Sequence, residues 1–195
     1  MSTINRRDLL PNLLANPDDF LIVSGLAGAS KDTAGLTDDG ANLFTMAGAM
    51  GSTTSMGLGV ALAAPTKPVL AVAGDGELMM GIGALATVAS MMPDNLTIIC
   101  IDNGMHAETG GQLGHTSRRT NLAVMAEGAG IPSVLEIDAP GQFAEAATFI
   151  TDAPGPRFLW ARVTTEPPTA YKRDFDLAAR RQIFRTAFLE NNPVD

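Results

Sequence analysis

Two short polar segments, each directly after an apolar stretch, constrain the fold of this chain more than any other feature. Gly74-Asp75-Gly76 follows the apolar residues 68–73, and Asp102-Asn103-Gly104 follows the apolar residues 96–101. A helix over residues 77–91 fits between them, so the segment predicts a β-α-β unit of about 30 residues. Parallel neighbouring strands end at the same edge of a sheet, where open α/β sheets bind ligands. We therefore expect Asp75 and Asn103 to lie side by side at that edge.

The residue types at this edge predict a site for a divalent cation and a phosphate group. The Asp75 carboxylate and the Asn103 amide oxygen are the hard ligands that Mg²⁺ prefers, and Mg²⁺ is commonly bound together with phosphates. Gly74 and Gly76 let the backbone approach a phosphate closely. A helix that begins near Glu77 would point free N–H groups at the same ligand. We expect the Glu77 carboxylate to point away, because phosphates would repel it.

Strand-like and helix-like segments alternate along the chain, which predicts an α/β fold: a doubly wound, mostly parallel six-stranded sheet with helices on both faces. Residues 25–40 are rich in Gly, Ala, Ser and Asp and predict a loop with room for a short helix. The composition becomes charged after Pro167-Pro168, so we expect a domain over residues 1–166 and a tail over residues 167–195 with an amphipathic helix. The predicted strands are residues 20–23, 42–46, 68–73, 96–101, 133–137 and 157–163, and the predicted helices are residues 6–14, 50–64, 77–91, 121–127, 141–151 and 174–190.

The composition excludes several classes of protein. The net charge of −8 argues against nucleic acid as a partner, because binding to a phosphate backbone needs a basic face. No segment reaches the roughly 20 apolar residues of a membrane-spanning helix, and the first residues lack the apolar core of a signal peptide. The one cysteine, Cys100, lies in an apolar strand and cannot form an internal disulfide. We therefore expect a cytoplasmic protein without a membrane partner.

The pattern of Gly74-Asp75-Gly76, a β-α-β spacer and Asn103 resembles the diphosphate-binding domain of thiamine diphosphate-dependent enzymes. The resemblance implies that the Asp75 and Asn103 side chains and the backbone carbonyl of Met105 ligate Mg²⁺, with diphosphate oxygens and water completing an octahedron. The family usually carries two asparagines here, and Asp102 takes the place of the first. Glu77 stands where many members have a small hydroxyl residue.

A second segment, Ser55-Met56-Gly57-Leu58-Gly59, resembles the part of these enzymes that follows the loop contacting the pyrimidine ring of the cofactor. The resemblance implies that Met56 is the apolar residue that forces the two cofactor rings into a V-shaped arrangement. It also implies that Gly48-Ala49-Met50 supplies backbone contacts to the pyrimidine. The alternative for Met56 is core packing, as one of ten methionines.

Within this superfamily, residues 43–131 resemble the β subunit of sulfopyruvate decarboxylase and the matching part of phosphonopyruvate decarboxylase. The resemblance implies a subunit of a thiamine diphosphate-dependent 2-oxo acid decarboxylase that acts on a small anionic substrate. A carboligase of the same superfamily and a non-catalytic cofactor-binding subunit are the alternatives. The segments that carry the likeness are Met50-Gly51-Ser52, Gly76-Glu77-Leu78-Met79-Met80, residues 102–112 and Thr120-Asn121-Leu122.

The resemblance also implies a protein partner. A complete enzyme of this type needs a pyrimidine-binding domain, which carries the glutamate that activates the cofactor. A chain of 195 residues has room for one such domain. We therefore expect a separate subunit to supply the activating glutamate, in a hetero-oligomer with the cofactor at the interface.

Candidate substrate-handling residues lie in the loop after the second polar segment. His106 and His115 are the only histidines, and histidine transfers protons near neutral pH, although solvation is the commoner role of a loop histidine. Glu108 lies near, but not in strict register with, the position of an acid that handles the decarboxylation product in some relatives. Arg118 and Arg119 either hold a sulfonate or phosphonate through their guanidinium groups or form a solvated pair before a helix.

A dinucleotide-binding oxidoreductase is the main rival interpretation. Gly81-Ile82-Gly83-Ala84-Leu85-Ala86 fits the pattern G-x-G-x-x-A. This segment falls inside a predicted helix, whereas a dinucleotide must bind at the turn from strand to helix. We therefore attribute the pattern to helix packing.

Overall fold

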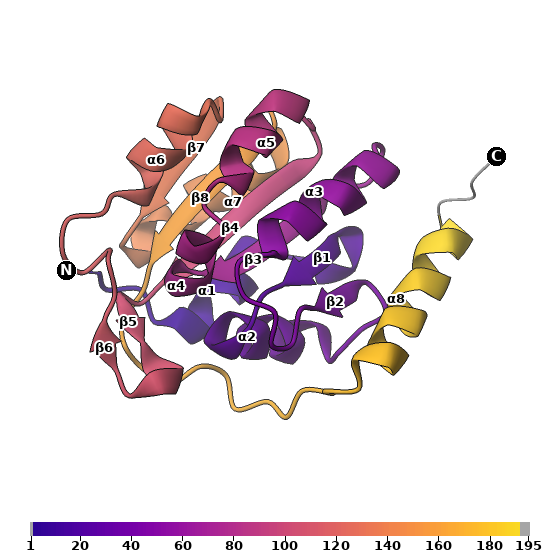
Figure 1. Cartoon of the computed structure of the whole chain (residues 1–195), viewed down its shortest axis with the longest axis horizontal. Coiled ribbons are helices and arrows are strands. Elements are labelled where there is room, and N and C mark those ends of the chain that lie inside the picture. Colours follow the sequence, from indigo (N-terminus) through magenta and orange to yellow (C-terminus); the bar gives the residue numbers. More distant parts are fainter. Residues whose placement is uncertain (1, 192–195) are drawn as a thin grey trace.

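Six apolar segments form the strands of one sheet in the computed structural model, which describes residues 2–191 (Figure 1). The strand order is β2-β1-β3-β4-β8-β7, and each neighbouring pair is parallel. The prediction of a doubly wound, six-stranded α/β sheet is confirmed. The strands are β1 (Leu21–Ser24), β2 (Leu43–Thr45), β3 (Val69–Gly74), β4 (Leu96–Asp102), β7 (Ser133–Ile137) and β8 (Arg157–Arg162).

Residues that alternate along a strand face opposite sides of the sheet, and each side has its own hydrophobic core. On β3, Leu70 and Val72 belong to one core, whereas Val69 and Ala71 belong to the other. Every residue of β4 is buried, which is typical of a parallel strand covered on both faces. The first core is covered by α1 (Arg6–Leu13), α2 (Ala27–Thr37) and α7 (Phe143–Asp152), and the second by α3 (Thr53–Ala63), α4 (Asp75–Met80), α5 (Ala84–Met91) and α6 (Leu122–Ala129).

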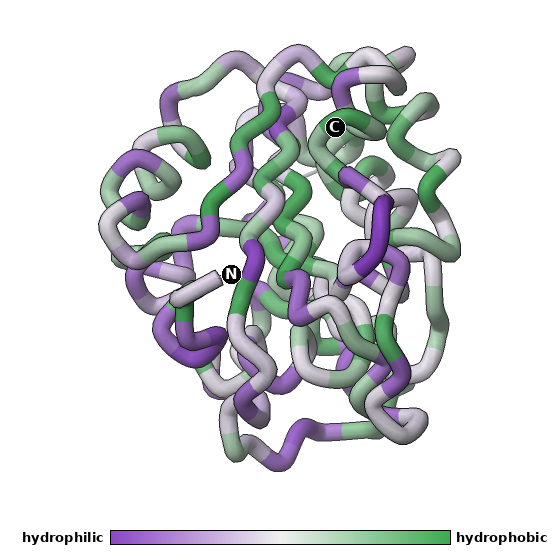
Figure 2. Tube along the Cα trace, turned by 90° about the vertical axis from the view of Figure 1, so that its left-hand side faces the viewer, coloured by the Kyte–Doolittle hydropathy of each residue, from purple (hydrophilic) through white to green (hydrophobic). Residues whose placement is uncertain are grey.

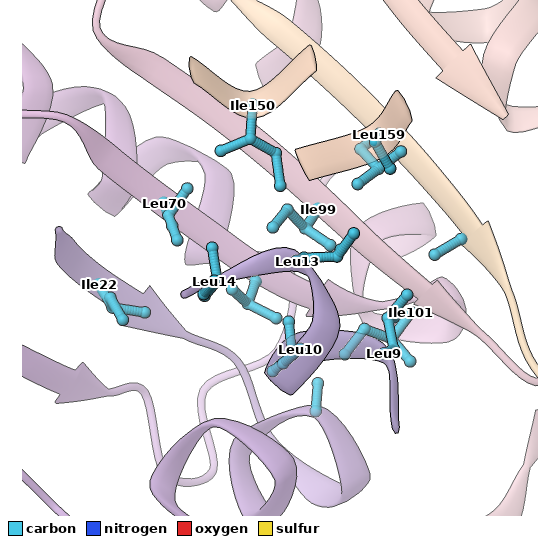
Figure 3. Packing of buried hydrophobic residues seen from close by; sticks show 14 of the residues in the cluster. Leu9, Leu10, Leu13, Leu14, Ile22, Leu70, Ile99, Ile101, Ile150 and Leu159 are labelled. Carbon is cyan, nitrogen blue, oxygen red and sulfur yellow. The ribbon is translucent and has the colours of Figure 1, made fainter. Parts of the chain in front are cut away.

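Helix α1 shows how the first core is built. Asn5 caps the helix by accepting a hydrogen bond from the backbone N–H of Arg7. Leu9 and Leu13 follow one another at helical spacing and pack beside Ile99 and Ile101 of β4 (Figure 3). Full burial of one such leucine contributes about 2 kcal/mol.

The hydropathy of the chain follows this layering. Hydrophobic residues concentrate along the strands in the middle of the molecule, and hydrophilic residues lie mainly in the outer segments (Figure 2). Cys100 is fully buried in β4 as a free thiol. No helix within residues 2–191 has the length and apolar character needed to cross a membrane.

Residues 25–40 differ from the prediction, because they form an eleven-residue helix, α2, where mainly loop was expected. The small side chains that suggested a loop are what allow this helix to lie close to the sheet. Ala29, Thr33 and Ala34 are all buried against it.

The single helix predicted over residues 77–91 is two helices, α4 and α5. Helix α4 begins at Asp75, inside the polar turn and earlier than expected. It ends before Gly81, where a tertiary contact intervenes: a Cβ at Gly81 would lie 1.9 Å from the carbonyl oxygen of Gly51. The G-x-G-x-x-A pattern therefore falls at the break between two helices, still away from the turn that follows β3.

A small hairpin after β4 and a C-terminal helix after β8 complete the fold. A small antiparallel hairpin, β5 (Met105–His106) and β6 (Gln112–Leu113), follows the second polar segment. After β8 the chain runs along the lower edge of the view in Figure 1, past the hairpin and α2, to α8 (Leu177–Asn191). Helix α8 packs on β2, where Phe184 contacts Phe44 and the Arg180 guanidinium donates to backbone carbonyls.

Candidate functional site

The carboxyl ends of β3 and β4 bring the two polar segments together. The strands pair with Gly74 opposite Ile101, so Asp75 follows β3 at the level where Asp102 ends β4. Asp75 and Asn103 both line a cavity of about 200 Å³ at this edge of the sheet. This is the edge at which open α/β sheets bind ligands.

Most of the predicted site residues line this cavity. The predicted metal ligands Asp75, Asn103 and Met105 are among them. The proton-transfer candidates His106 and Glu108 lie in the same wall. The lining also includes Met50, Gly74 and Gly76, which were predicted to contact the cofactor, and Glu77, whose backbone was predicted to face the phosphate while its carboxylate points away.

Several predicted residues are not part of the cavity lining, among them Gly48, Met56 and His115. Gly48 and Met56 are exposed, and Met56 has 40% of its surface accessible on α3. His115 is also exposed, with its ring centroid 6.4 Å from that of His106. The roles expected for these three residues therefore stay predictions.

The Asp75 carboxylate lies in an environment that disfavours its negative charge. Burial, followed by the charge of Asp102, raises the pKa of Asp75 to about 7, whereas hydrogen bonds from the backbone act in the opposite direction. A cation bound to Asp75 would displace its proton and would offset the repulsion from Asp102. The electrostatics of the pair thus favour a divalent ion at this position.

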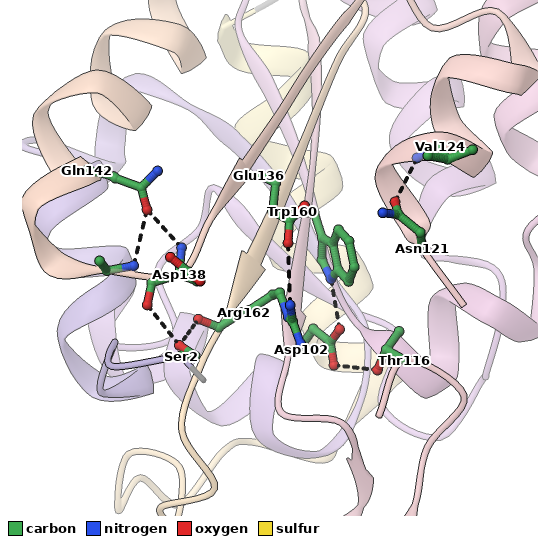
Figure 4. A network of polar contacts seen from close by, with 11 residues as sticks. Ser2, Asp102, Thr116, Asn121, Val124, Glu136, Asp138, Gln142, Trp160 and Arg162 are labelled. Carbon is green, nitrogen blue, oxygen red and sulfur yellow. Dashed lines mark hydrogen bonds and ion pairs between the residues drawn. The ribbon is translucent and has the colours of Figure 1, made fainter. Parts of the chain in front are cut away.

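Asp102 is the hub of a buried polar network (Figure 4). Its Oδ1 accepts hydrogen bonds from Gly104 N–H at 2.7 Å and from Thr116 Oγ1 at 2.8 Å, and its Oδ2 accepts from Trp160 Nε1 at 2.8 Å. The carboxylate therefore fixes the start of the loop that carries Asn103. From the sequence, Asp102 was expected only to take the place of an asparagine, and this structural role was missed. No local pattern around Asp102 indicates its partners, because Trp160 lies 58 residues further along the chain.

Glu77 links α4 to the first residue of α3. Its side chain is buried, and its Oε1 accepts a hydrogen bond from the Thr53 hydroxyl. A Cβ at Gly25 would lie 1.7 Å from Oε2, so only glycine fits beside this carboxylate. Burial raises the pKa of Glu77, while hydrogen bonds from Thr53 and from the backbone lower it. These contacts hold the Glu77 carboxylate within the cavity wall. The expectation that it points away from a bound phosphate stays a prediction.

The imidazole of His106 lies against the polar turn between β3 and α4. A Cβ at Gly76 would lie 2.8 Å from His106 Nδ1, so any larger residue at position 76 would force the ring to move. The hairpin holds His106 in place, since its carbonyl accepts from Gly111 N–H at 3.0 Å. A titratable side chain therefore stands directly beside the predicted metal and phosphate ligands.

The available oxygen ligands suit a hard cation that shares its coordination with a ligand. Within residues 2–191 no group of three or more His, Cys, Asp or Glu side chains is arranged to hold a metal ion. Asp75 offers a carboxylate, and Asn103 offers an amide oxygen that otherwise accepts from Met105 N–H at 3.1 Å. A cation here must take its other ligands from backbone carbonyls, water or a bound phosphate, a combination typical of Mg²⁺.

Comparison with known proteins gives one family match. The sequence pattern of the family described as thiamine pyrophosphate enzyme, C-terminal TPP binding domain, matches residues 34–160, which is more than half of the chain. A solved structure, described as that of a thiamin diphosphate-dependent enzyme isolated from Mycobacterium smegmatis, shares the fold with a TM-score of 0.69 at 20% identity. It is matched over 83% of this chain and 32% of its own length.

Two curated relatives are similar in sequence. The chain is 36% identical to sulfopyruvate decarboxylase subunit beta of Methanocaldococcus jannaschii, over 66% of this chain and 68% of that protein. It is 47% identical to phosphonopyruvate decarboxylase of Streptomyces viridochromogenes over 53% of this chain. The matched part spans only 26% of the length of the Streptomyces protein.

Proposed function

We propose that this chain, which belongs to the thiamine pyrophosphate enzymes through its C-terminal-type TPP-binding domain, is one subunit of a 2-oxo acid decarboxylase. The predicted resemblance to thiamine diphosphate-dependent decarboxylases is confirmed at the level of the family. The observation that carries the proposal is the shared edge of β3 and β4, where the Asp75 carboxylate and the Asn103 amide line one cavity. That edge is where a divalent ion and a diphosphate would be held together.

The residues present fit the cofactor that the family implies. Asp75, Asn103 and the Met105 carbonyl would hold Mg²⁺, and the absence of side chains at Gly74 and Gly76 would let a diphosphate approach the backbone. When bound, thiamine diphosphate supplies a nucleophilic ring carbon and accepts electrons as carbon dioxide leaves the 2-oxo acid.

Two titratable side chains of the cavity wall are the candidates for proton transfer. His106 lies against the polar turn, and Glu108 lines the same cavity from the hairpin. Either side chain would deliver a proton to the product or hold it in place after carbon dioxide departs. Their positions support, on geometry alone, the roles expected from the sequence.

A partner subunit would complete the site by supplying the pyrimidine-binding domain and its activating glutamate. The naming of the Methanocaldococcus relative as a beta subunit supports this division. Gly48, Met50 and Met56 are all exposed in the isolated chain. They would be available to a cofactor ring that is held mainly by another polypeptide.

The test is to co-express the chain with the product of the neighbouring reading frame and to purify the complex. Carbon dioxide release would be measured from pyruvate, sulfopyruvate and phosphonopyruvate, with and without Mg²⁺ and thiamine diphosphate. We expect release that requires both additions and that is lost in Asp75→Ala but kept in Asp138→Ala, a matched exposed control. Cofactor binding without turnover of any 2-oxo acid would contradict the proposal and favour a non-catalytic subunit.

A further inference from the structure

An anionic substrate in the cavity beside Asp75 and Asn103 needs a cation to neutralise it, and neither Arg6 nor the arginines predicted from the sequence are free in this cavity. Arg6 lines the cavity, but its Nε and Nη2 atoms donate to one oxygen of Asp32 at 2.8 and 2.7 Å. Arg118 and Arg119, the arginines predicted from the sequence, are exposed and are not part of the lining. Within this chain, a cation that recognises the anion would therefore come from another segment.

Arg173 lies in the connection between β8 and α8 and is buried without a hydrogen-bonding partner. The residue is 9% exposed, and its guanidinium carbon lies 4.7 Å from the ring centroid of Phe175. Among the described residues, no group accepts a hydrogen bond from its buried Nε and Nη1 atoms. Two buried guanidinium N–H groups without an acceptor are unfavourable by themselves, and a ligand that accepts from the guanidinium would account for them.

Arg173 faces a second cavity, of about 570 Å³, beside the first one. Its lining includes Lys31, Lys172 and Arg173 and contains no Asp or Glu. The two cavities are neighbours, because Pro168 lines both of them. Glu108 of the first cavity also lies close to the second, with Oε1 3.8 Å from Lys31 Nζ.

The connection that carries Arg173 is anchored on both sides of this residue. Asp32 Oδ1 accepts from Thr169 N–H at 2.7 Å, and Asp38 Oδ1 accepts from the Tyr171 hydroxyl at 2.8 Å. The Asp174 N–H donates to Asp39 Oδ2 at 3.0 Å. Arg173 is thus held in place before any ligand binds, which lowers the entropy lost on binding.

We propose that Arg173, with Lys31 and Lys172, forms an oxyanion-binding subsite for the sulfonate or phosphonate group that a small 2-oxo acid carries beside its keto group. The inference rests on the proposed function and assigns the substrate recognition that function requires. A guanidinium offers two parallel N–H groups to such tetrahedral oxyanions, and the ammonium groups add positive charge. Glu108 and Asp39 are the acidic groups whose charges act on Arg173, and neither of them bonds to Nε or Nη1.

The test uses the complex with its partner subunit and the variants Arg173→Gln and Arg173→Lys. In Arg173→Gln, KM for sulfopyruvate and phosphonopyruvate should rise roughly tenfold or more, because a charge-assisted hydrogen bond is lost. KM for pyruvate, or Ki if pyruvate is not turned over, should stay unchanged. Arg173→Lys should restore part of the loss, and Arg181→Gln, which removes an exposed arginine of α8, should have no effect.

An equal effect on all three compounds, or no effect on any of them, would overturn the subsite. If Arg173→Gln does not fold, Lys172→Gln, which removes an exposed cation of the same cavity, replaces it with the same expected selectivity. A complex that is inactive on every 2-oxo acid would refute the proposed function but leave the subsite testable on the chain alone. Titration with inorganic phosphate and sulfate should then shift the guanidinium nitrogen signal of Arg173 in NMR spectra, and an unmoved signal would refute the subsite.

Discussion

Replacing Asp102 by asparagine should destabilise the chain, although the two side chains have nearly the same shape. Asp102 is 3% exposed, and its two oxygens accept three hydrogen bonds. If the amide oxygen of the asparagine faces Gly104 and Thr116, its NH₂ group faces the indole N–H of Trp160. Two donors then face each other, and one hydrogen bond is lost. Loss of one buried charge-assisted hydrogen bond costs about 1.5–3 kcal/mol. Removal of the repulsion with Asp75 offsets part of this cost, so we expect a net loss of about 2 kcal/mol.

A double-mutant cycle isolates the contribution of the Asp102–Trp160 pair. Trp160→Phe removes the indole donor, leaves Asp102 Oδ2 without a partner and should cost about 1–3 kcal/mol. In the double variant Asp102→Asn/Trp160→Phe, no two donors face each other. The double variant should therefore lose less stability than the sum of the single variants, by about 1–2 kcal/mol.

The free energies of unfolding would be measured by urea titration followed by far-ultraviolet circular dichroism, since Trp160 is the single tryptophan and two variants lack its fluorescence. Asn95→Ala is the control, because Asn95 precedes β4 at its opposite end and donates to the carbonyls of Ala61, Ala64 and Lys67. The stability lost in Asn95→Ala and the stability lost in Trp160→Phe should sum to the loss in the double variant Asn95→Ala/Trp160→Phe, within about 0.5 kcal/mol. Additive costs for Asp102→Asn and Trp160→Phe would refute the role of Asp102 as an acceptor for the indole.

Two further predictions concern the break after α4 and the anchored connection before α8. Gly81→Ala should lower the free energy of unfolding by about 2 kcal/mol or more, because its Cβ would meet the Gly51 carbonyl. Gly83→Ala, which has nothing within 4 Å, should change it by less than about 0.5 kcal/mol, and equal costs in urea titrations would contradict the contact. Tyr171 is the single tyrosine, and its hydrogen bond to Asp38, the largest cause, raises its pKa from 10.0 to about 12. Because the folded pKa is the higher one, the stabilisation is present below pH 10 and is lost as the pH rises to about 12. Titration of phenolate absorbance should give a midpoint near 12 that falls towards 10 in Asp38→Asn, and the same midpoint in both proteins would rule out the bond.

The sheet and the cavity edge were predictable because their signals are local. Continuous apolar stretches such as β4 are buried on both faces, and polar residues can follow them only where the strand leaves the core. The spacing between Asp75 and Asn103 then requires one crossover helix segment, which places the two strands side by side. The start of α6 depends on a signal of the same local kind, because the Asn121 side chain caps the helix by accepting a hydrogen bond from Val124 N–H (Figure 4).

The remaining features depend on contacts between distant parts of the chain. The break at Gly81 arises from the backbone of Gly51, and no local pattern records that approach. Arg173 is separated from Lys31 by most of the sequence, so the cationic cavity exists only once the connection to α8 has folded across α2. The adjacent arginines Arg118 and Arg119 are easier to notice in the sequence than the isolated Arg173, yet both of them are exposed in the structure.

Binding of Mn²⁺, a paramagnetic substitute for Mg²⁺, would be measured by electron paramagnetic resonance on the complex of the chain with its partner, because this signal reports on the metal site of Asp75 and Asn103 itself. If Asp75 and Asn103 hold a diphosphate through a divalent ion, thiamine diphosphate should strengthen Mn²⁺ binding by about tenfold or more, because coupling between the two ligands is reciprocal. Asp75→Asn should abolish this gain, and the exposed control Asp138→Asn should keep it. Mn²⁺ affinity that ignores the cofactor, or that is the same in Asp75→Asn as in the unaltered chain, would contradict the account.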